Sequence, residues 1–337
     1  MAWRLSLLPT MNIISVKDLR KEFRVPLRKS GFLGQISSLF SREYIKRTAL
    51  DDISFDIGEG ELIGYIGPNG AGKSTTVKIL SGILVPSGGV VKVLGKTPWE
   101  HRVETVRQLG VVFGQRTQLW WDLPVIESFE LLRDIYRISS KEYKNTLDSL
   151  VEALELSKLC DVPVRQLSLG QRMRCDIAAS LLHSPRILFL DEPTIGLDAV
   201  SKLAVRDFIR HLNKNNKVTV MLTTHDMDDI ESLCQRVIVL NEGQIFLDGT
   251  LGDLRKKMAP ERRLIVDLQM EHDSISDPQA TILKQEGHRV WLSYDPTQIS
   301  TPELIRRITM QHAIRDLYVE NPPIEEIIAK LYRTANL

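Results

Sequence analysis

The sequence predicts an α/β protein whose core is a mostly parallel sheet, followed by a smaller α+β unit. Two observations carry this prediction. Short apolar runs at 62–66, 187–190 and 218–222 alternate with stretches of helical periodicity, the pattern of strands that helices cover on both faces. The pattern then restarts after the Lys-Lys-Met-Ala-Pro run at 256–260. A chain of 337 residues is long enough for two such cores.

The first domain is expected to span 1–255. It opens with a strand, and an irregular segment over about 24–47 then breaks the pattern, which we interpret as an insertion. The expected elements are a strand over 12–23, a strand over 62–66, a helix over 73–84, a largely helical region over 124–160, strands over 187–190 and 218–222 with a helix between them, and a hairpin of strands over 237–240 and 244–246.

The second domain is expected to be a compact β-β-α-β-α unit over 262–337. Its elements are strands over 264–268 and 290–294, a helix over 302–310, a strand over 314–319 and an amphipathic helix over 324–332.

Composition excludes several classes of protein. Hydrophobic residues make up 43% and charged residues 26%, as in soluble globular proteins, and 44 basic against 43 acidic residues leave a net charge of +1. A near-neutral chain argues against nucleic acid as the main ligand. Three widely spaced cysteines without a Cys-x-x-Cys pair predict neither disulfides nor a zinc site, and favour a reducing compartment. No apolar run is long enough to span a bilayer.

The segment from Arg20 to Arg47 departs from this neutrality, with eight basic and two acidic residues. We interpret it as a basic, partly amphipathic insertion that faces a membrane, or else as a solvated loop. The ten residues before Met11 are too short for a signal peptide, and either Met1 or Met11 fits as the natural start.

The strongest motif is the phosphate loop, residues 67–74, which matches G-x-x-x-x-G-K-[ST] between a predicted strand and a predicted helix. Its glycines allow backbone N–H groups to surround phosphate oxygens at a helix N-terminus. Lys73 is expected to reach the β- and γ-phosphates, and Ser74 to coordinate Mg²⁺.

A second motif ends the apolar strand 187–190 with two adjacent carboxylates, Asp191 and Glu192. A buried strand gains nothing from such an end unless a cation or a reaction uses it. We expect Asp191 to hold magnesium and Glu192 to polarise the attacking water.

A third motif, Ser168-Leu169-Gly170-Gln171, opens a predicted helix. Ser168 suits a helix N-cap, which explains the serine but not the Gly-Gln pair. These three motifs, followed by Gly196-Leu197-Asp198 and by His225, resemble in order and spacing the nucleotide-binding subunit of ABC transporters, over roughly residues 12–250.

The resemblance implies a P-loop NTPase cassette with a parallel-sheet core, an antiparallel β subdomain and a helical subdomain. In that family two cassettes pair head to tail, and each ATP lies between the phosphate loop of one chain and the signature, Ser168-Leu169-Gly170-Gln171 here, of the other. A homodimeric ATPase that uses ATP and Mg²⁺ is therefore expected, attached peripherally to the cytoplasmic face of the inner membrane.

The resemblance also assigns site residues. Catalytic roles fall to Glu192, His225, Lys73 and Gln115, and magnesium binding falls to Ser74, Gln115 and Asp191. The implied nucleotide contacts are Gly67, Pro68, Asn69, Gly70, Ala71, Gly72, Lys73, Ser74, Thr75, Phe23, Ser168, Gly170, Gln171 and Asp198.

Two departures from the family pattern stand out. Leu169 replaces the first of two signature glycines, whereas Gly170 is kept, so we expect an active site. Phe23 best matches the aromatic residue that stacks on adenine, with Tyr44 as a rival because of the insertion.

Residues 110–124 resemble the ATP-binding subunits of ABC-2-type exporters, in the branch of daunorubicin-resistance and viologen-exporter ATPases. The resemblance implies separate membrane permease subunits, contacted near Trp120 and Trp121. Adjacent tryptophans cannot both point inward, so at least one should be exposed.

Other classes with a phosphate loop fit less well. ABC proteins of translation carry two cassettes in one chain, and those of DNA repair carry a long coiled coil between phosphate loop and signature. This chain has one phosphate loop and only residues 75–167 between it and the signature. A GTPase would need Asn-Lys-x-Asp, and residues 213–216 lack the acid.

Overall fold

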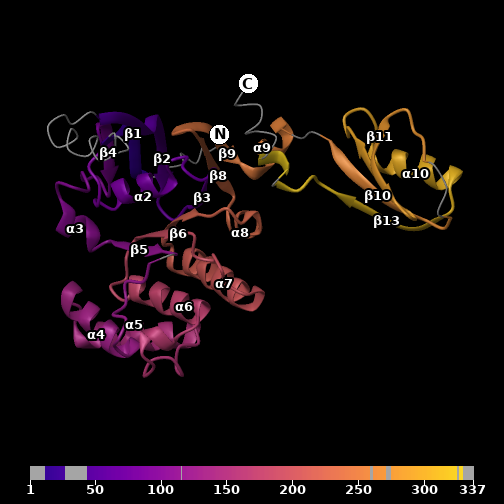
Figure 1. Cartoon of the computed structure of the whole chain (residues 1–337). Helices are drawn as coiled ribbons and strands as arrows, with labels where there is room; N and C mark the ends of the chain where they lie inside the picture. Colours follow the sequence, from indigo (N-terminus) through magenta and orange to yellow (C-terminus); the bar gives the residue numbers. More distant parts are fainter. Residues whose placement is uncertain are drawn as a thin grey trace, which may run out of the picture. The chain divides into compact units, whose positions relative to one another are not determined.

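The computed structural model describes residues 12–26, 44–114, 116–258, 261–270, 275–324 and 326–328 (Figure 1). The chain forms two compact units, 1–248 and 249–337. Both candidate start methionines and most of the basic insertion lie outside the described residues. Among the helices that the structure describes, none is both long and apolar enough to cross a bilayer.

A six-stranded sheet in the order β5-β6-β7-β3-β8-β9 organises the first unit. Its central pairs are parallel, and their register places Asp191, at the end of β6, between Phe113 of β5 and Thr223 of β7. The central strands are almost fully buried, as expected when helices cover both faces. The strands are Leu62–Ile66 (β3), Leu109–Phe113 (β5), Ile187–Asp191 (β6), Thr219–Thr223 (β7), Arg236–Asn241 (β8) and Gln244–Thr250 (β9).

A second, antiparallel sheet in the order β2-β1-β4 packs against this core. Its buried residues, such as Ile14 and Ile57, join Ile63 and Phe189 of the six-stranded sheet in one hydrophobic cluster. The predicted combination of a parallel core and an antiparallel sheet is confirmed. The strands are Asn12–Pro26 (β1), Tyr44–Gly58 (β2) and Gly88–Val93 (β4).

Helices complete the first unit, and α4 and α5 gather with α6 at the end away from the antiparallel sheet (Figure 1). This end corresponds to the predicted helical subdomain. The helices are Lys73–Leu80 (α2), Arg102–Val106 (α3), Val125–Tyr136 (α4), Ser140–Ala153 (α5), Leu169–Leu181 (α6), Ala199–Asn216 (α7) and Met227–Leu233 (α8).

Two predicted boundaries in this unit were wrong. The strand predicted over 12–23 continues to Pro26, three residues into the segment interpreted as an insertion, because it pairs with β2 as far as Tyr44. The helix predicted over 73–84 ends at Leu80, since Gly82 adopts a left-handed backbone with φ +72°.

The second unit begins with helix α9, Leu251–Met258, and contains a four-stranded antiparallel sheet in the order β11-β12-β10-β13. Helix α10 packs Leu304 and Ile308 against one sheet face. The sequence missed β11, an edge strand with mostly exposed residues and no clear apolar alternation. These elements are Arg262–Leu268 (β10), Ala280–Glu286 (β11), Arg289–Tyr294 (β12), Thr301–Gln311 (α10) and Ile314–Glu320 (β13).

The helix predicted over 324–332 is helical at Ile324 and over 326–328. Ile324, Ile327 and Ile328 are buried there, in keeping with the predicted amphipathic pattern. The rest of that prediction lies outside the described residues.

Candidate active site

The phosphate loop connects β3 to α2 and is shaped for an anion. Gly72 has φ +109°, and a Cβ placed on it would come within 2.7 Å of the Ala49 carbonyl oxygen, so only glycine fits. Neither an acidic side chain in the first turn nor a side-chain cap occupies the N-terminus of α2. Its amide groups therefore remain available for phosphate oxygens.

Lys73 lies inside this loop. Its ammonium group donates to the carbonyl oxygens of Gly67, at 2.7 Å, and Pro68, at 3.1 Å. Burial lowers the pKa of Lys73, while the nearby charges of Glu192 and Asp191 act in the opposite direction. A partly dehydrated cation beside the helix N-terminus is suited to bind phosphate oxygens.

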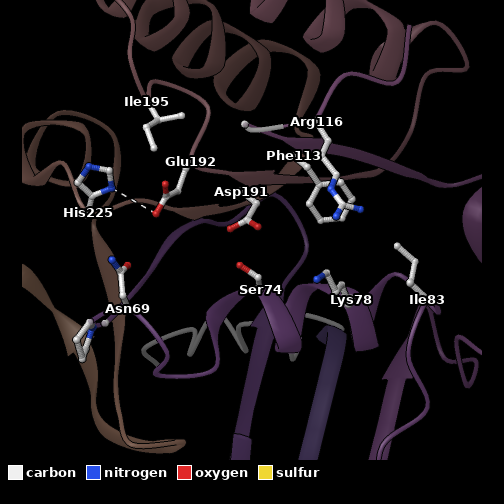
Figure 2. Close-up of a pocket in the computed structure, with 13 residues that line it drawn as sticks. Asn69, Ser74, Lys78, Ile83, Phe113, Arg116, Asp191, Glu192, Ile195 and His225 are labelled. Carbon is white, nitrogen blue, oxygen red and sulfur yellow. Dashed lines mark ion pairs between the residues drawn. The ribbon is translucent and has the colours of Figure 1, made fainter. Parts of the chain in front are cut away.

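Asp191 ends β6 and faces Ser74, the second residue of α2, across the cleft (Figure 2). The Thr223 hydroxyl of the neighbouring strand donates a hydrogen bond to the Asp191 carboxylate. A carboxylate and a hydroxyl that share an open cleft form the donor set that Mg²⁺ uses together with waters and phosphates. The residues present therefore fit a magnesium ion.

Glu192 stands at the start of a strained turn. It has φ +56°, which is rare for a residue with a side chain, and its backbone N–H donates to the Thr223 carbonyl at 2.8 Å. Gly114 makes this turn possible, because a Cβ there would lie 2.2 Å from the Glu192 carbonyl oxygen. The Glu192 carboxylate approaches His225 with 3.3 Å between Oε1 and Nδ1, and 61% of the His225 side chain is exposed.

These groups line one cleft of about 940 Å³ (Figure 2). The cleft brings together predicted residues from the phosphate loop, β6 and the loop after β7, whereas Lys73, Thr75, Gly70 and Gly72 line a smaller adjoining cavity. Ala71 is buried behind them. The larger cleft is lined by Gly67, Pro68, Asn69, Ser74, Lys78, Ile83, Phe113, Gly114, Arg116, Asp191, Glu192, Ile195 and His225.

Several lining residues were missed by sequence reasoning. Arg116 directly follows Gln115, and Phe113 ends β5 beside Asp191, so adjacency to known motifs could have identified both. Lys78 and Ile83 lie in or after α2 without any functional pattern. Gln115 itself lies outside the described residues, and its catalytic and magnesium-binding roles stay predictions.

The signature residues lie elsewhere. Ser168 is the N-cap of α6 and forms a capping box with Gln171: the Ser168 hydroxyl accepts from the Gln171 amide at 3.2 Å, and the Gln171 side chain accepts from the Ser168 amide at 2.9 Å. Neither residue lines the cleft of its own chain, nor does Gly170.

Asp198 has an equivalent position on α7. Its carboxylate caps that helix by accepting from the Ser201 amide at 2.9 Å and from the Ser201 hydroxyl at 2.8 Å, and these bonds lower its pKa. Gly170 packs against the same residue, because a Cβ on Gly170 would lie 2.8 Å from the Ser201 Oγ. The unusual Leu169 rests against Gly196 in the loop before α7.

The two aromatic candidates for adenine stacking lie on the β1–β2 hairpin. Phe23 is 36% exposed, with the Lys21 ammonium 5.1 Å from its ring centroid, and Tyr44 is 45% exposed. Neither of them lines the cleft. The stacking role of Phe23 remains a prediction.

The expected exposure of the tryptophan pair is confirmed. Trp120 is 38% and Trp121 is 50% exposed, and Leu119 beside them is buried. The Arg172 guanidinium of α6 lies 5.7 Å from the Trp121 ring centroid, so the pair contacts the signature helix.

Comparisons with known proteins agree with this architecture. A family model described as "ABC transporter" matches residues 50–195. The ABC transporter ATP-binding protein NatA of Bacillus subtilis is 32% identical over 206 residues, which cover 61% of this chain and 83% of NatA. The daunorubicin resistance ATP-binding protein DrrA3 of Streptomyces coeruleorubidus is 29% identical over 300 residues, covering 86% of this chain and 93% of DrrA3.

Other similarities are partial or structural. The probable multidrug ABC transporter ATP-binding protein YbhF of Escherichia coli is 36% identical over 217 residues, 64% of this chain, and the match spans only 37% of YbhF. A dimeric post-hydrolysis ATP-binding cassette, MJ0796 bound to ADP and Pi, superimposes with a TM-score of 0.59 at 28% identity, covering 71% of this chain and 98% of that one. The chain belongs to the family of ABC transporter ATP-binding proteins.

Proposed function

We propose that this chain hydrolyses ATP with Mg²⁺, as one half of a head-to-tail homodimer that powers export through separate ABC-2-type membrane subunits. The observation that carries the proposal is the Glu192–His225 pair, which stands beside the phosphate loop at the mouth of one cleft (Figure 2). A structural phosphate-binding loop would not need a carboxylate and an imidazole aimed at the same space.

The predicted residues at the cleft and the adjoining cavity have distinct roles in this reaction. The α2 N-terminus and Lys73 bind the phosphates, and Ser74 with Asp191 would hold the magnesium ion, which neutralises charge on the phosphates when bound. Glu192, one residue beyond the magnesium ligand, accepts a proton from the attacking water. His225 contacts the Glu192 carboxylate through Nδ1, which orients that carboxylate and places the imidazole beside the γ-phosphate.

The dimer is inferred from predicted nucleotide contacts that do not line the cleft of their own chain. Ser168, Gly170 and Gln171 open α6, and Asp198 opens α7, away from their own phosphate loop. In a head-to-tail pair they complete the site of the partner chain. The similar cassette MJ0796 is described as dimeric, which supports this arrangement.

Export is supported by the names of the relatives. These include daunorubicin resistance, bacitracin transport and multidrug ABC transporter ATP-binding proteins. We place the chain at the cytoplasmic face of the inner membrane, with a permease helix docked at Trp120 and Trp121. The exposed Arg24, Lys46 and Arg47 at the described ends of the basic insertion would face anionic lipid headgroups.

The reaction is tested by comparing the ATPase activity of the purified wild-type chain with that of a Glu192→Gln variant. The wild-type chain should release phosphate from Mg²⁺-ATP, and the variant should bind ATP without hydrolysis. Export is tested by purifying the chain together with the membrane proteins encoded beside it. Compounds are then screened for stimulation of the ATPase activity of that complex. Equal turnover by wild type and variant would contradict the role of Glu192.

A further inference from the structure

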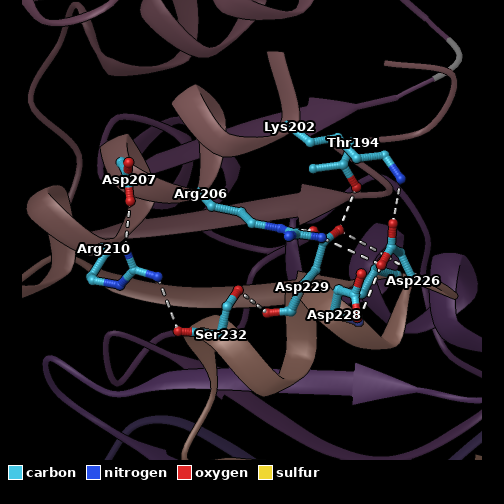
Figure 3. Close-up of polar contacts among 10 residues, drawn as sticks. Thr194, Lys202, Arg206, Asp207, Arg210, Asp226, Asp228, Asp229 and Ser232 are labelled. Carbon is cyan, nitrogen blue, oxygen red and sulfur yellow. Dashed lines mark hydrogen bonds and ion pairs between the residues drawn. The ribbon is translucent and has the colours of Figure 1, made fainter. Parts of the chain in front are cut away.

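Asp229 of α8 lies behind the cleft, where its side chain is completely buried. Its Oδ2 atom accepts a hydrogen bond from the Thr194 hydroxyl (Figure 3). The same atom accepts a second hydrogen bond, at 3.3 Å, from the Thr224 hydroxyl. Its Oδ1 atom accepts a hydrogen bond from Nε of Arg206, a residue of α7, at 2.5 Å. One carboxylate thus joins three segments that lie apart in the sequence.

Two of these segments carry the reacting pair. Thr194 lies two residues after Glu192, and Thr224 directly precedes His225. Both threonines are buried, with at most 2% exposed, so their hydroxyls exchange little with water. The Asp229 carboxylate therefore joins the Glu192 and His225 loops through their side chains, in addition to the backbone bond between Glu192 and Thr223.

The other side of His225 is held as well. Asp226 accepts from Lys202 at 2.5 Å and from Arg206 at 3.4 Å, and its amide donates to the Thr224 hydroxyl at 3.0 Å. His225 itself is mostly exposed and contacts Glu192 at 3.3 Å. The position of this exposed imidazole therefore depends on Glu192 and on the buried residues next to it in the chain.

We infer that Asp229 is a positioning residue for the proposed hydrolysis, which holds the Glu192 and His225 loops at the separation that the reaction needs. The Thr194 and Thr224 hydroxyls transmit that position, and Arg206 neutralises the buried carboxylate. This inference rests on the proposed function and adds to it a carboxylate that touches no substrate.

The substitution Thr194→Val tests this inference with little disturbance of the surrounding packing. Removing Asp229 would leave the mostly buried Arg206 with only its longer contact to Asp226 and could unfold the chain, whereas Val keeps the shape of Thr and replaces only its hydroxyl with a methyl group. Thr194→Ser restores the hydroxyl. Thr105→Val is the matched control, because Thr105 is also buried and its hydroxyl bonds to the His101 carbonyl at 2.9 Å, away from the cleft.

We expect kcat for ATP to fall about tenfold in Thr194→Val, the order of effect that misplacement of reacting groups produces. KM should stay close to wild type, because the phosphate loop is untouched. Thr194→Ser should recover most of kcat, and Thr105→Val should keep it. Unchanged kcat in Thr194→Val, or a loss that serine does not restore, would overturn the inference.

Hydrogen exchange separates this inference from the proposed function. In Thr194→Val, peptides that cover 190–196 and 222–228 should exchange faster together, and Thr105→Val should leave both unchanged. This result holds whether or not the wild-type chain hydrolyses ATP. Faster exchange in only one of the two segments would show that they are not joined at Asp229.

Discussion

The two halves of the proposed nucleotide site differ in how their polar groups are satisfied. In the cleft, Glu192 adopts a strained backbone and faces an exposed His225 across open space. At the helix starts, Ser168 and Asp198 are bonded to their own helices through a capping box and an Asx cap. The polar groups of the first half are therefore free to meet a ligand, whereas those of the second half are hydrogen-bonded within their own helices.

The contacts within one chain account for the second half of the site but not for the first. A helix cap explains every bond that Ser168 and Asp198 make, so their part in binding ATP depends on a second chain. The Glu192–His225 pair needs a reaction to explain it, since neither strain nor exposure stabilises the fold. Substitutions in the two halves should therefore fail in different ways.

Glu192→Gln should give the largest effect. Loss of the carboxylate removes the proton acceptor, so kcat should fall by about a hundredfold or more. Nucleotide binding should persist, because Lys73 and the α2 N-terminus are unchanged. Phosphate release and equilibrium binding of a fluorescent ATP analogue measure the two properties, and loss of both together would indicate a structural role instead.

Replacement of Trp120 and Trp121 by alanine should act on the partner and not on the cleft. Aromatic anchors at interfaces often contribute about 2 kcal/mol or more, roughly a thirtyfold loss of affinity. Co-purification with the permease should fail while ATP binding stays near wild type. Tyr318→Ala, an exposed aromatic of the second unit, is the control. Retained co-purification would place the permease contact elsewhere.

Ser168→Ala distinguishes a helix cap from a residue of a shared site, because the two roles predict different results. As a cap alone, the change costs about 1 kcal/mol of unfolding free energy and spares turnover. If Ser168 is also part of a shared site, the substitution lowers ATPase activity several-fold as well. Ser139→Ala removes an equivalent cap on α5, where the Ser139 hydroxyl accepts from Glu142 at 3.3 Å, and should cost stability alone. Equal activity in both variants would leave the cap as the whole role.

Substitution of Asp176 should give the smallest effect, a change in the pH dependence of the unfolding free energy. This buried carboxylate of α6 accepts from Thr117 and from the Gln118 amide, and burial raises its pKa to about 6. A raised carboxyl pKa gives stability that is present below the unfolded value, near 4, and is lost as pH rises through 6. In Asp176→Asn, unfolding free energy relative to wild type should therefore rise by about 1 kcal/mol between pH 5 and pH 7.5. Urea unfolding at both values checks the sign, and a fall would contradict it.

The parts of the site that the sequence predicted are those with local signals. The phosphate loop, Asp191 and Glu192 follow apolar strands directly, and the parallel register then brings strand ends together without further information. The α/β class was predictable for the same reason. The Asp229 carboxylate was not, because its partners lie 5, 23 and 35 residues away and share no local pattern.

Edges of the fold were also hard to predict. Strand β11 is exposed along most of its length, so no apolar alternation distinguishes it from a loop. The continuation of β1 to Pro26 depends on pairing with the first residues of β2, which lie at the other end of the segment interpreted as an insertion. In both cases hydrogen bonds to a distant segment decide the structure, and the strand's own residues do not.

If each ATP site is divided between two chains, two variants that are defective in different halves should complement each other when they are mixed. Glu192→Gln damages the cleft half, whereas Ser168→Glu places a negative charge where the partner's phosphate would bind and still suits a helix N-terminus. Each variant alone should be inactive, and a mixture should recover ATPase activity, because a mixed dimer has one intact site. An active Ser168→Glu chain, or a mixture as inactive as its parts, would contradict the divided site.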